Sequence, residues 1–203
     1  MFLWICKIIG WIPIKILLPH RVYGKKNVPK NNRRGLILCC NHTSIFDPVY
    51  LLLNTRRRIF FMAKEELFKN TVAKNLLKWF GVFAVKRGAG DTGAIDKGVQ
   101  IIEKGKIMGI FPEGRRSKDF APKKAKVGVA YIAQMTKADI LPVSIYCEGK
   151  IKLFKRVTLR YGEVIKFEDL GLSEDENNMR ELKVAAEKIM TEVTNLWSKK
   201  HEK

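Results

Sequence analysis

The chain has 203 residues, of which 46% are hydrophobic and 29% charged, enough apolar material for one sizeable core and too much for a disordered chain. Four cysteines are too few for a disulfide-stapled secreted scaffold, so we expect a reducing, cytosol-facing compartment. The formal net charge is +19. The excess lies in residues 1–160, which favours a polyanionic partner such as nucleic acid, an anionic membrane surface or an acidic carrier protein.

The first 18 residues form the most apolar stretch of the chain. Lysines, a glycine and a proline interrupt it before the roughly 20 residues that a membrane-spanning helix needs; they are Lys7, Gly10, Pro13 and Lys15. On a helix, Trp4 and Trp11 share a narrow face with the two lysines, a composition typical of the headgroup layer. We predict that residues 1–20 form an interfacial anchor, which places the protein at the cytoplasmic side of the cell membrane as a peripheral or monotopic protein. The alternative is a helix that docks on the protein's own core.

Apolar runs, polar turns and amphipathic segments alternate along residues 21–203. Strands are predicted over residues 35–40, 82–85, 106–111, 140–146 and 157–165, and helices over residues 46–53, 92–104 and 125–136. A closing amphipathic helix is predicted to open with the capping-box spacing of Ser173 and Glu176. This alternation indicates a single α/β domain with a central, mostly parallel or mixed sheet flanked by helices, whose strand ends could converge on one site.

His42 is one of three histidines and directly follows a strand that is predicted to be buried. Positions five apart on one helix differ by about 140°, so His42 and Asp47 can meet only if His42 lies in the turn before the helix. A carboxylate on one ring nitrogen would fix the tautomer and leave the other nitrogen to take a proton from a hydroxyl. The pair is therefore a candidate general base. Alternatively, Asp47 only caps the helix, or Ser44 acts as a covalent nucleophile beside His42.

Cations follow the later strands. The strand ending at residue 111 leads into a Pro-Glu-Gly turn and then Arg115 and Arg116, whose guanidinium groups can bind a phosphate bidentately. Arg87 follows the predicted strand 82–85, and Lys126 precedes the helix near Gly128. Each cation alone is typical of a solvated surface, but their placement at successive strand ends indicates a shared anion site.

Four segments, in this order, resemble the motif blocks of the glycerolipid acyltransferase family, which includes the 1-acylglycerol-3-phosphate acyltransferases. They are NHTSIFD at residues 41–47, GVFAVKR at 81–87, FPEGRRS at 111–117 and LPVSI at 141–145. The sequence departs from the family pattern at Arg115, where a small polar residue is usual, and at Lys86, where an acidic residue is frequent.

The resemblance implies roles for individual residues. His42 would be the base and Asp47 its partner. The expected substrate-binding residues are Asn41, Ser44, Arg87, Glu113, Gly114, Arg115, Arg116 and Lys126.

The resemblance also implies a reaction. An acyl chain would pass from acyl carrier protein or coenzyme A to the 2-hydroxyl of lysophosphatidic acid (1-acylglycerol 3-phosphate), giving phosphatidic acid at a membrane lipid bilayer. Glycerol 3-phosphate or another lysolipid is the alternative acceptor. Because a thioester is already activated, we expect no metal and no cofactor beyond the acyl donor.

Three competing interpretations remain. Residues 88–93 match the G-x-G-x-x-G pattern of dinucleotide-binding proteins, although the same glycines also suit the loop after Arg87. Cys39, Cys40 and His42 could suggest a metal, but neighbouring strand residues face opposite sides and further ligands are missing. A basic nucleic-acid-binding module would explain the charge but would leave the N-terminal segment and His42 without a role. We therefore expect no nucleic-acid partner.

Overall fold

The computed structural model describes residues 16–30, 35–85, 92–173 and 178–202. These ranges form a seven-stranded sheet with the order β1-β7-β6-β2-β5-β3-β4. The strands are β1 (His20–Tyr23), β2 (Leu36–Cys40), β3 (Ile59–Lys64), β4 (Val82–Val85), β5 (Ile107–Ile110), β6 (Asp139–Tyr146) and β7 (Val157–Tyr161). Strands β6 and β7 pair antiparallel and the other neighbouring pairs are parallel. The predicted single α/β domain with a mixed sheet is confirmed.

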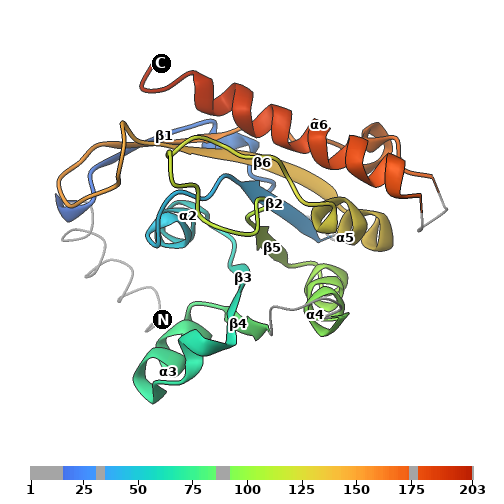
Figure 1. Ribbon diagram of the computed structural model, residues 1–203, viewed down its shortest axis with the longest axis horizontal. Coiled ribbons are helices and arrows are strands. Elements are labelled where there is room, and N and C mark those ends of the chain that lie inside the picture. Colours follow the sequence, from blue (N-terminus) through green and yellow to red (C-terminus); the bar gives the residue numbers. More distant parts are fainter. Residues whose placement is uncertain (1–15, 31–34, 86–91, 174–177, 203) are drawn as a thin grey trace.

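Helices cover both faces of the sheet (Figure 1). They are α2 (Asp47–Asn54), α3 (Thr71–Trp79), α4 (Thr92–Glu103), α5 (Gly128–Thr136) and α6 (Met179–Ser198), with short 3-10 turns η1 (Lys25–Asn27), η2 (Glu65–Phe68) and η3 (Phe167–Leu170). Because successive strand residues alternate between faces, Cys40 joins the apolar cluster that includes α2, and Cys39 joins the cluster that includes α4, α5 and α6. Burial on both faces explains why β2 is apolar along its whole length.

The carboxyl ends of several parallel strands lie at one edge of the sheet, where a functional site could form. Strands β2 to β6 run in the same direction, so their carboxyl ends lie at the same edge. Strand β7 runs the other way and pairs its first residues with the last residues of β6. His20 at the start of β1 pairs with Val157 at the start of β7. The described chain therefore enters the sheet at the edge where β2 and β6 end.

Several elements differ from the sequence predictions. Strands β1 and β3 and helix α3 were not predicted, because β1 has only four half-exposed residues and β3 directly follows three arginines. The last predicted strand ends at Tyr161 rather than at residue 165. The N–H of Gly162 turns to the Pro142 carbonyl, and only Ile165 returns to the sheet as an isolated bridge.

The start of the closing helix was predicted wrongly. Helix α6 begins at Met179, and the side chain of Asn178 accepts the N–H of Glu181 at 3.2 Å. The Glu181 carboxylate in turn accepts the side-chain N–H of Asn178 and the backbone N–H of Ser173, both at 2.8 Å. Ser173 therefore supports the cap from outside the helix, because the capping pair is Asn178 with Glu181.

Residues 1–15 lie outside the described part of the chain, so the predicted anchor over residues 1–20 stays a prediction. Of that segment the structure describes residues 16–20, in which Ile16 and Leu17 are helical and lead into β1 at His20. Within the described ranges, every helix is too short or too polar to cross a bilayer.

Candidate active site

The polar segment after β2 turns so that His42 and Asp47 meet. Nδ1 of His42 lies 2.8 Å from Oδ2 of Asp47. The same oxygen accepts the backbone N–H groups of Thr43 at 2.7 Å and Ser44 at 2.8 Å. Asp47 is fully buried and is the first residue of α2, so its carboxylate lies at the positive end of the helix dipole as well as beside these backbone donors. The contact predicted between the histidine of the turn and the aspartate of the first helical turn is present.

The Asp47 contact assigns the tautomer of His42. Oδ2 of Asp47 accepts two backbone N–H groups, and we assign Nδ1 of His42 as the third donor to this oxygen. Nε2 then has a free lone pair, as a general base requires. The His42 side chain is 18% exposed, whereas that of Asp47 is 0% exposed. The imidazole can therefore be reached from solvent while its carboxylate partner cannot.

Stacked aromatic rings fix the orientation of the His42 imidazole. Phe111 stacks on the His42 ring with centroids 4.1 Å apart and planes inclined by 20°. Phe61 stacks in turn on Phe111, at 5.6 Å and 13°. Gly109 lies behind Phe61, where a Cβ atom would come within 2.2 Å of the Phe61 ring. These contacts connect the sheet core to the candidate base.

The turn that follows β5 forms hydrogen bonds with both the N–H and the carbonyl of His42. The N–H of His42 is donated to Oε1 of Glu113 at 2.9 Å, and its carbonyl accepts the N–H of Ser117 at 2.7 Å. Gly114 has φ +72, a conformation that favours glycine, and this confirms the predicted tight turn. The segment 111–117 therefore helps to position the segment 41–47.

Glu113 was expected to contact the substrate, but the structure places its side chain behind the backbone of His42, with 5% of the residue exposed. Burial raises the pKa of Glu113 from 4.5 to about 7, although the N–H that His42 donates favours the charged form. Because the charged form is disfavoured in the folded protein, the free energy of unfolding should fall as the pH rises from about 4.5 to about 7.

Replacing Glu113 tests this assignment. Glu113→Gln keeps an oxygen for the His42 N–H but removes the charge, so we expect it to gain stability relative to wild type between pH 5 and pH 8, by up to about 3 kcal/mol. Glu113→Ala leaves the His42 N–H without this acceptor and should lose about 1–3 kcal/mol at pH 5. Urea unfolding at both pH values measures the differences. A Gln variant with the same relative stability at pH 5 and pH 8 would contradict the buried-charge assignment.

Asn41 and Ser44 were also expected to bind substrate. Asn41 is fully buried, donates to the Ile145 carbonyl at 2.9 Å and accepts the Ile145 N–H at 2.8 Å. Its amide therefore joins the end of β2 to the end of β6 and presents no exposed surface to a ligand. Ser44 is half-buried and its hydroxyl accepts the N–H of Phe46 at 3.2 Å, which supports a role in shaping the turn.

The predicted cations lie around this turn as far as the structure describes them. Arg115 and Arg116 are exposed in the segment between Glu113 and Ser117, both of which bond to the backbone of His42. The side chain of Lys126 lies over Gly114, where an added Cβ would meet its Cε at 3.0 Å. Arg87 lies outside the described residues, so its place in the site stays a prediction.

The aromatic support of His42 was not predicted. Phe111 directly precedes the Pro-Glu-Gly turn, and Phe61 lies in β3, a strand that was not predicted either. The local signal for Phe111 is its position at the end of an apolar run that precedes a polar turn. The stacking depends on the pairing of β5 with both β2 and β3.

Comparisons with known proteins identify the family of this chain. A family model described as Acyltransferase matches residues 20–146. The chain is 32% identical over 154 residues to the 1-acyl-sn-glycerol-3-phosphate acyltransferase of Bacillus subtilis, covering 69% of this chain and 75% of that protein. It is 30% identical over 172 residues to the protein of the same name from Streptococcus pneumoniae, covering 82% of this chain and 62% of that protein.

The fold has a counterpart among solved structures. The crystal structure of the 1-acyl-sn-glycerophosphate acyltransferase of Thermotoga maritima superposes with a TM-score of 0.67 and 25% sequence identity, over 94% of this chain and 79% of that chain. The family match includes the segment 41–47, the turn 111–117 and the end of β6. This chain therefore belongs to the acyltransferase family that includes the 1-acyl-sn-glycerol-3-phosphate acyltransferases.

Proposed function

We propose that this protein moves a fatty acyl chain from an acyl thioester to the 2-hydroxyl of 1-acylglycerol 3-phosphate, giving phosphatidic acid for phospholipid biosynthesis. The contact of 2.8 Å between His42 Nδ1 and Asp47 Oδ2 is the observation that carries the proposal. It leaves Nε2 of a half-buried imidazole free to act as a base. The names of the relatives support 1-acylglycerol 3-phosphate as the acceptor.

The proposed chemistry needs one base and the positioning of two substrates. Nε2 of His42 takes the proton of the acceptor hydroxyl while the oxygen attacks the thioester carbonyl carbon. The tetrahedral intermediate collapses with cleavage of the carbon–sulfur bond, and the leaving thiolate takes the proton back from the imidazolium. Asp47 stabilises that imidazolium throughout. Because the thioester is already activated, the reaction requires neither a metal nor an acyl-enzyme.

Release of the free thiol tests the reaction directly. Purified protein would be offered acyl-coenzyme A or acyl carrier protein as donor, each with 1-acylglycerol 3-phosphate, glycerol 3-phosphate or a lysolipid without a phosphate monoester. We expect acceptor-dependent thiol release with 1-acylglycerol 3-phosphate and phosphatidic acid as the product. Faster release with glycerol 3-phosphate would change the acceptor, and thiol release without any acceptor would indicate a hydrolase.

Arg116 is proposed to bind the acceptor phosphate, with Arg115 and Lys126 at the same rim. Loss of a charge-assisted hydrogen bond costs about 1.5–3 kcal/mol, so Arg116→Ala should raise the KM of the acceptor by about 10–100-fold and change kcat less. Lys124→Ala removes an exposed charge nearby and serves as the matched control. Steady-state kinetics with varied acceptor measures the split. An unchanged KM for Arg116→Ala would count against phosphate binding there.

Membrane attachment through residues 1–18 is part of the proposal, with the protein at the cytoplasmic side of the cell membrane. The basic excess of residues 1–160 supports binding to anionic lipid or to an acidic acyl carrier protein rather than to nucleic acid. A chain that lacks residues 1–15, and so keeps Leu17 and the buried Leu18, should bind anionic vesicles much more weakly than the full chain in a flotation assay. If it stays bound at the wild-type level, another surface is the main anchor.

A further inference from the structure

The loop between β6 and β7 exposes large apolar side chains. Leu153 is 54% exposed and Phe154 is 67% exposed, whereas Ile151 beside them is buried. Isolated apolar residues on a surface need no explanation, but two large neighbours at a loop tip form a patch that water solvates poorly. Burial of these two side chains in an apolar environment outside the protein would therefore be favourable.

The backbone holds Phe154 in an unfavourable conformation. Its φ is 62, in the left-handed region that bulky side chains rarely adopt. The N–H of Phe154 donates a hydrogen bond to the carbonyl of Leu17 at 2.7 Å, and Nζ of Lys155 donates one to the carbonyl of Glu148. The tip is thus held in place by hydrogen bonds while Phe154 stays 67% exposed, a combination that indicates a functional constraint.

The charges around the patch are mainly positive. Basic side chains alternate with the apolar ones, and Glu148 is the acidic residue of the loop 147–156; the basic residues are Lys150, Lys152, Lys155 and Arg156. Apolar side chains at a tip with lysine and arginine around them match an anionic bilayer, in which the rings enter the acyl boundary and the cations meet lipid phosphates.

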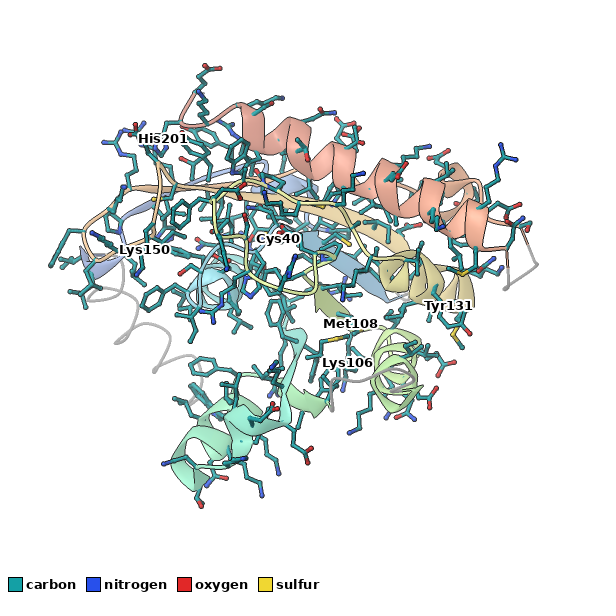
Figure 2. All side chains as sticks on the ribbon, viewed as in Figure 1. Cys40, Lys106, Met108, Tyr131, Lys150 and His201 are labelled. Atoms are coloured by element: carbon teal, nitrogen blue, oxygen red, sulfur yellow. The ribbon has the colours of Figure 1, made fainter. Side chains whose placement is uncertain are left out.

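The loop lies at the edge of the sheet that carries the candidate active site. Strand β6 ends beside the end of β2, and Asn41 bonds to both backbone groups of Ile145. The N–H of Val157 is donated to the carbonyl of Pro19, so the loop also borders the place where the chain enters the sheet. Figure 1 shows this loop at one end of the molecule beside the start of β1, and Figure 2 labels Lys150 within it.

We propose that the β6–β7 loop is a membrane contact in addition to the predicted N-terminal anchor, to which it is joined at Leu17, and that it inserts Leu153 and Phe154 into an anionic bilayer. Insertion at this edge would turn the partly exposed His42 side chain toward the lipid surface from which a lysolipid acceptor comes. Only this orienting role rests on the proposed function; the insertion itself follows from exposure, charge and backbone conformation.

Depth-dependent quenching tests insertion even if residues 1–18 dominate binding. Full-length Phe154→Trp protein would be mixed with vesicles of phosphatidylglycerol and phosphatidylcholine that carry brominated acyl chains. We expect the tryptophan introduced at position 154 to add quenching and a blue shift beyond those of the four native tryptophans. Val184→Trp, at an exposed position near the start of α6, is the matched control and should add none. Figure 1 shows the start of α6 at the opposite end of the molecule from this loop. Equal quenching of the two variants would overturn the proposal.

A second experiment separates this inference from the proposed enzymatic function. Leu153→Ser/Phe154→Ser protein should bind anionic vesicles about 10-fold more weakly and acylate vesicle-embedded acceptor more slowly, while it retains the wild-type rate on a soluble short-chain acceptor. Lys183→Gln/Val184→Ser on α6 is the control. If wild type acylates neither acceptor, the proposed function fails, and the quenching still decides the loop. A raised KM for acyl carrier protein with unchanged vesicle binding would make the loop a carrier-docking surface and overturn the membrane contact.

Discussion

Replacing His42 by alanine is expected to lower kcat by about 10²–10⁴-fold, the range that a positioned general base contributes. The imidazole is positioned by Asp47 at 2.8 Å and by the ring of Phe111 at 4.1 Å. Alanine removes the basic nitrogen that these contacts position. The variant should still fold, because the backbone contacts of residue 42 with Glu113 and Ser117 do not use the side chain. Single-turnover thiol release measures the rate, and circular dichroism checks the fold.

Asp47→Asn provides the companion measurement. Asparagine retains an oxygen for the backbone N–H groups of Thr43 and Ser44 but removes the charge that stabilises the imidazolium. We expect a rate between those of wild type and His42→Ala. Because the two residues act as a unit, the double variant should be no slower than His42→Ala alone. Near-wild-type turnover by His42→Ala, or independent losses that multiply in the double variant, would refute the assignment of the base.

Gly109→Ala is expected to destabilise the protein by about 1–3 kcal/mol and also to lower activity. The added Cβ would lie 2.2 Å from the Phe61 ring and 2.8 Å from the Ile59 side chain. Ile59 is fully buried and Phe61 nearly so, so neither can move into solvent. Displacement of Phe61 would shift Phe111, on which it stacks, and with it the plane of the His42 ring.

A matched glycine separates this effect from general glycine chemistry. Gly128 begins α5, and a Cβ added there meets nothing within 4 Å. Gly128→Ala should therefore be neutral or slightly stabilising, because alanine favours helix more than glycine does. Chemical denaturation and kcat are measured for both variants. A Gly109→Ala protein with wild-type stability would show that the core around Phe61 can expand, and wild-type kcat with lower stability would disconnect the aromatic stack from catalysis.

The sequence predicted local arrangements well where a few neighbouring residues decide them. The strand, polar turn and helix around residues 36–54 appear nearly as expected, and the contact of His42 with Asp47 follows from a turn that spans five residues. The short strand β1 escaped prediction because its four residues show no apolar run that would indicate burial. Strand β3 does begin with an apolar run, which was missed where it directly follows three arginines.

The roles of Glu113 and Asn41 could not be predicted in the same way. Glu113 lies 71 residues from His42 in sequence, and its carboxylate meets the His42 N–H only because β5 pairs beside β2. Asn41 meets Ile145, 104 residues away, through the pairing of β2 with β6. Both residues belong to family motif blocks, which suggested that they contact the substrate. In the structure both are buried and form hydrogen bonds with the backbone, which supports a structural role.

Short-range spacing, apolar periodicity and the order of the four motif segments were enough to infer the α/β class, the histidine–aspartate contact and the acyltransferase family, because each depends on neighbouring residues or on recurring sequence blocks. Only the tertiary structure decided three further features. These are the strand order, the hydrogen bonds of the turn 111–117 to the backbone of His42, and the position of the β6–β7 loop at the edge of the sheet that carries the site. Those features join distant segments, and the free energy that selects them comes from burying both faces of one sheet at the same time.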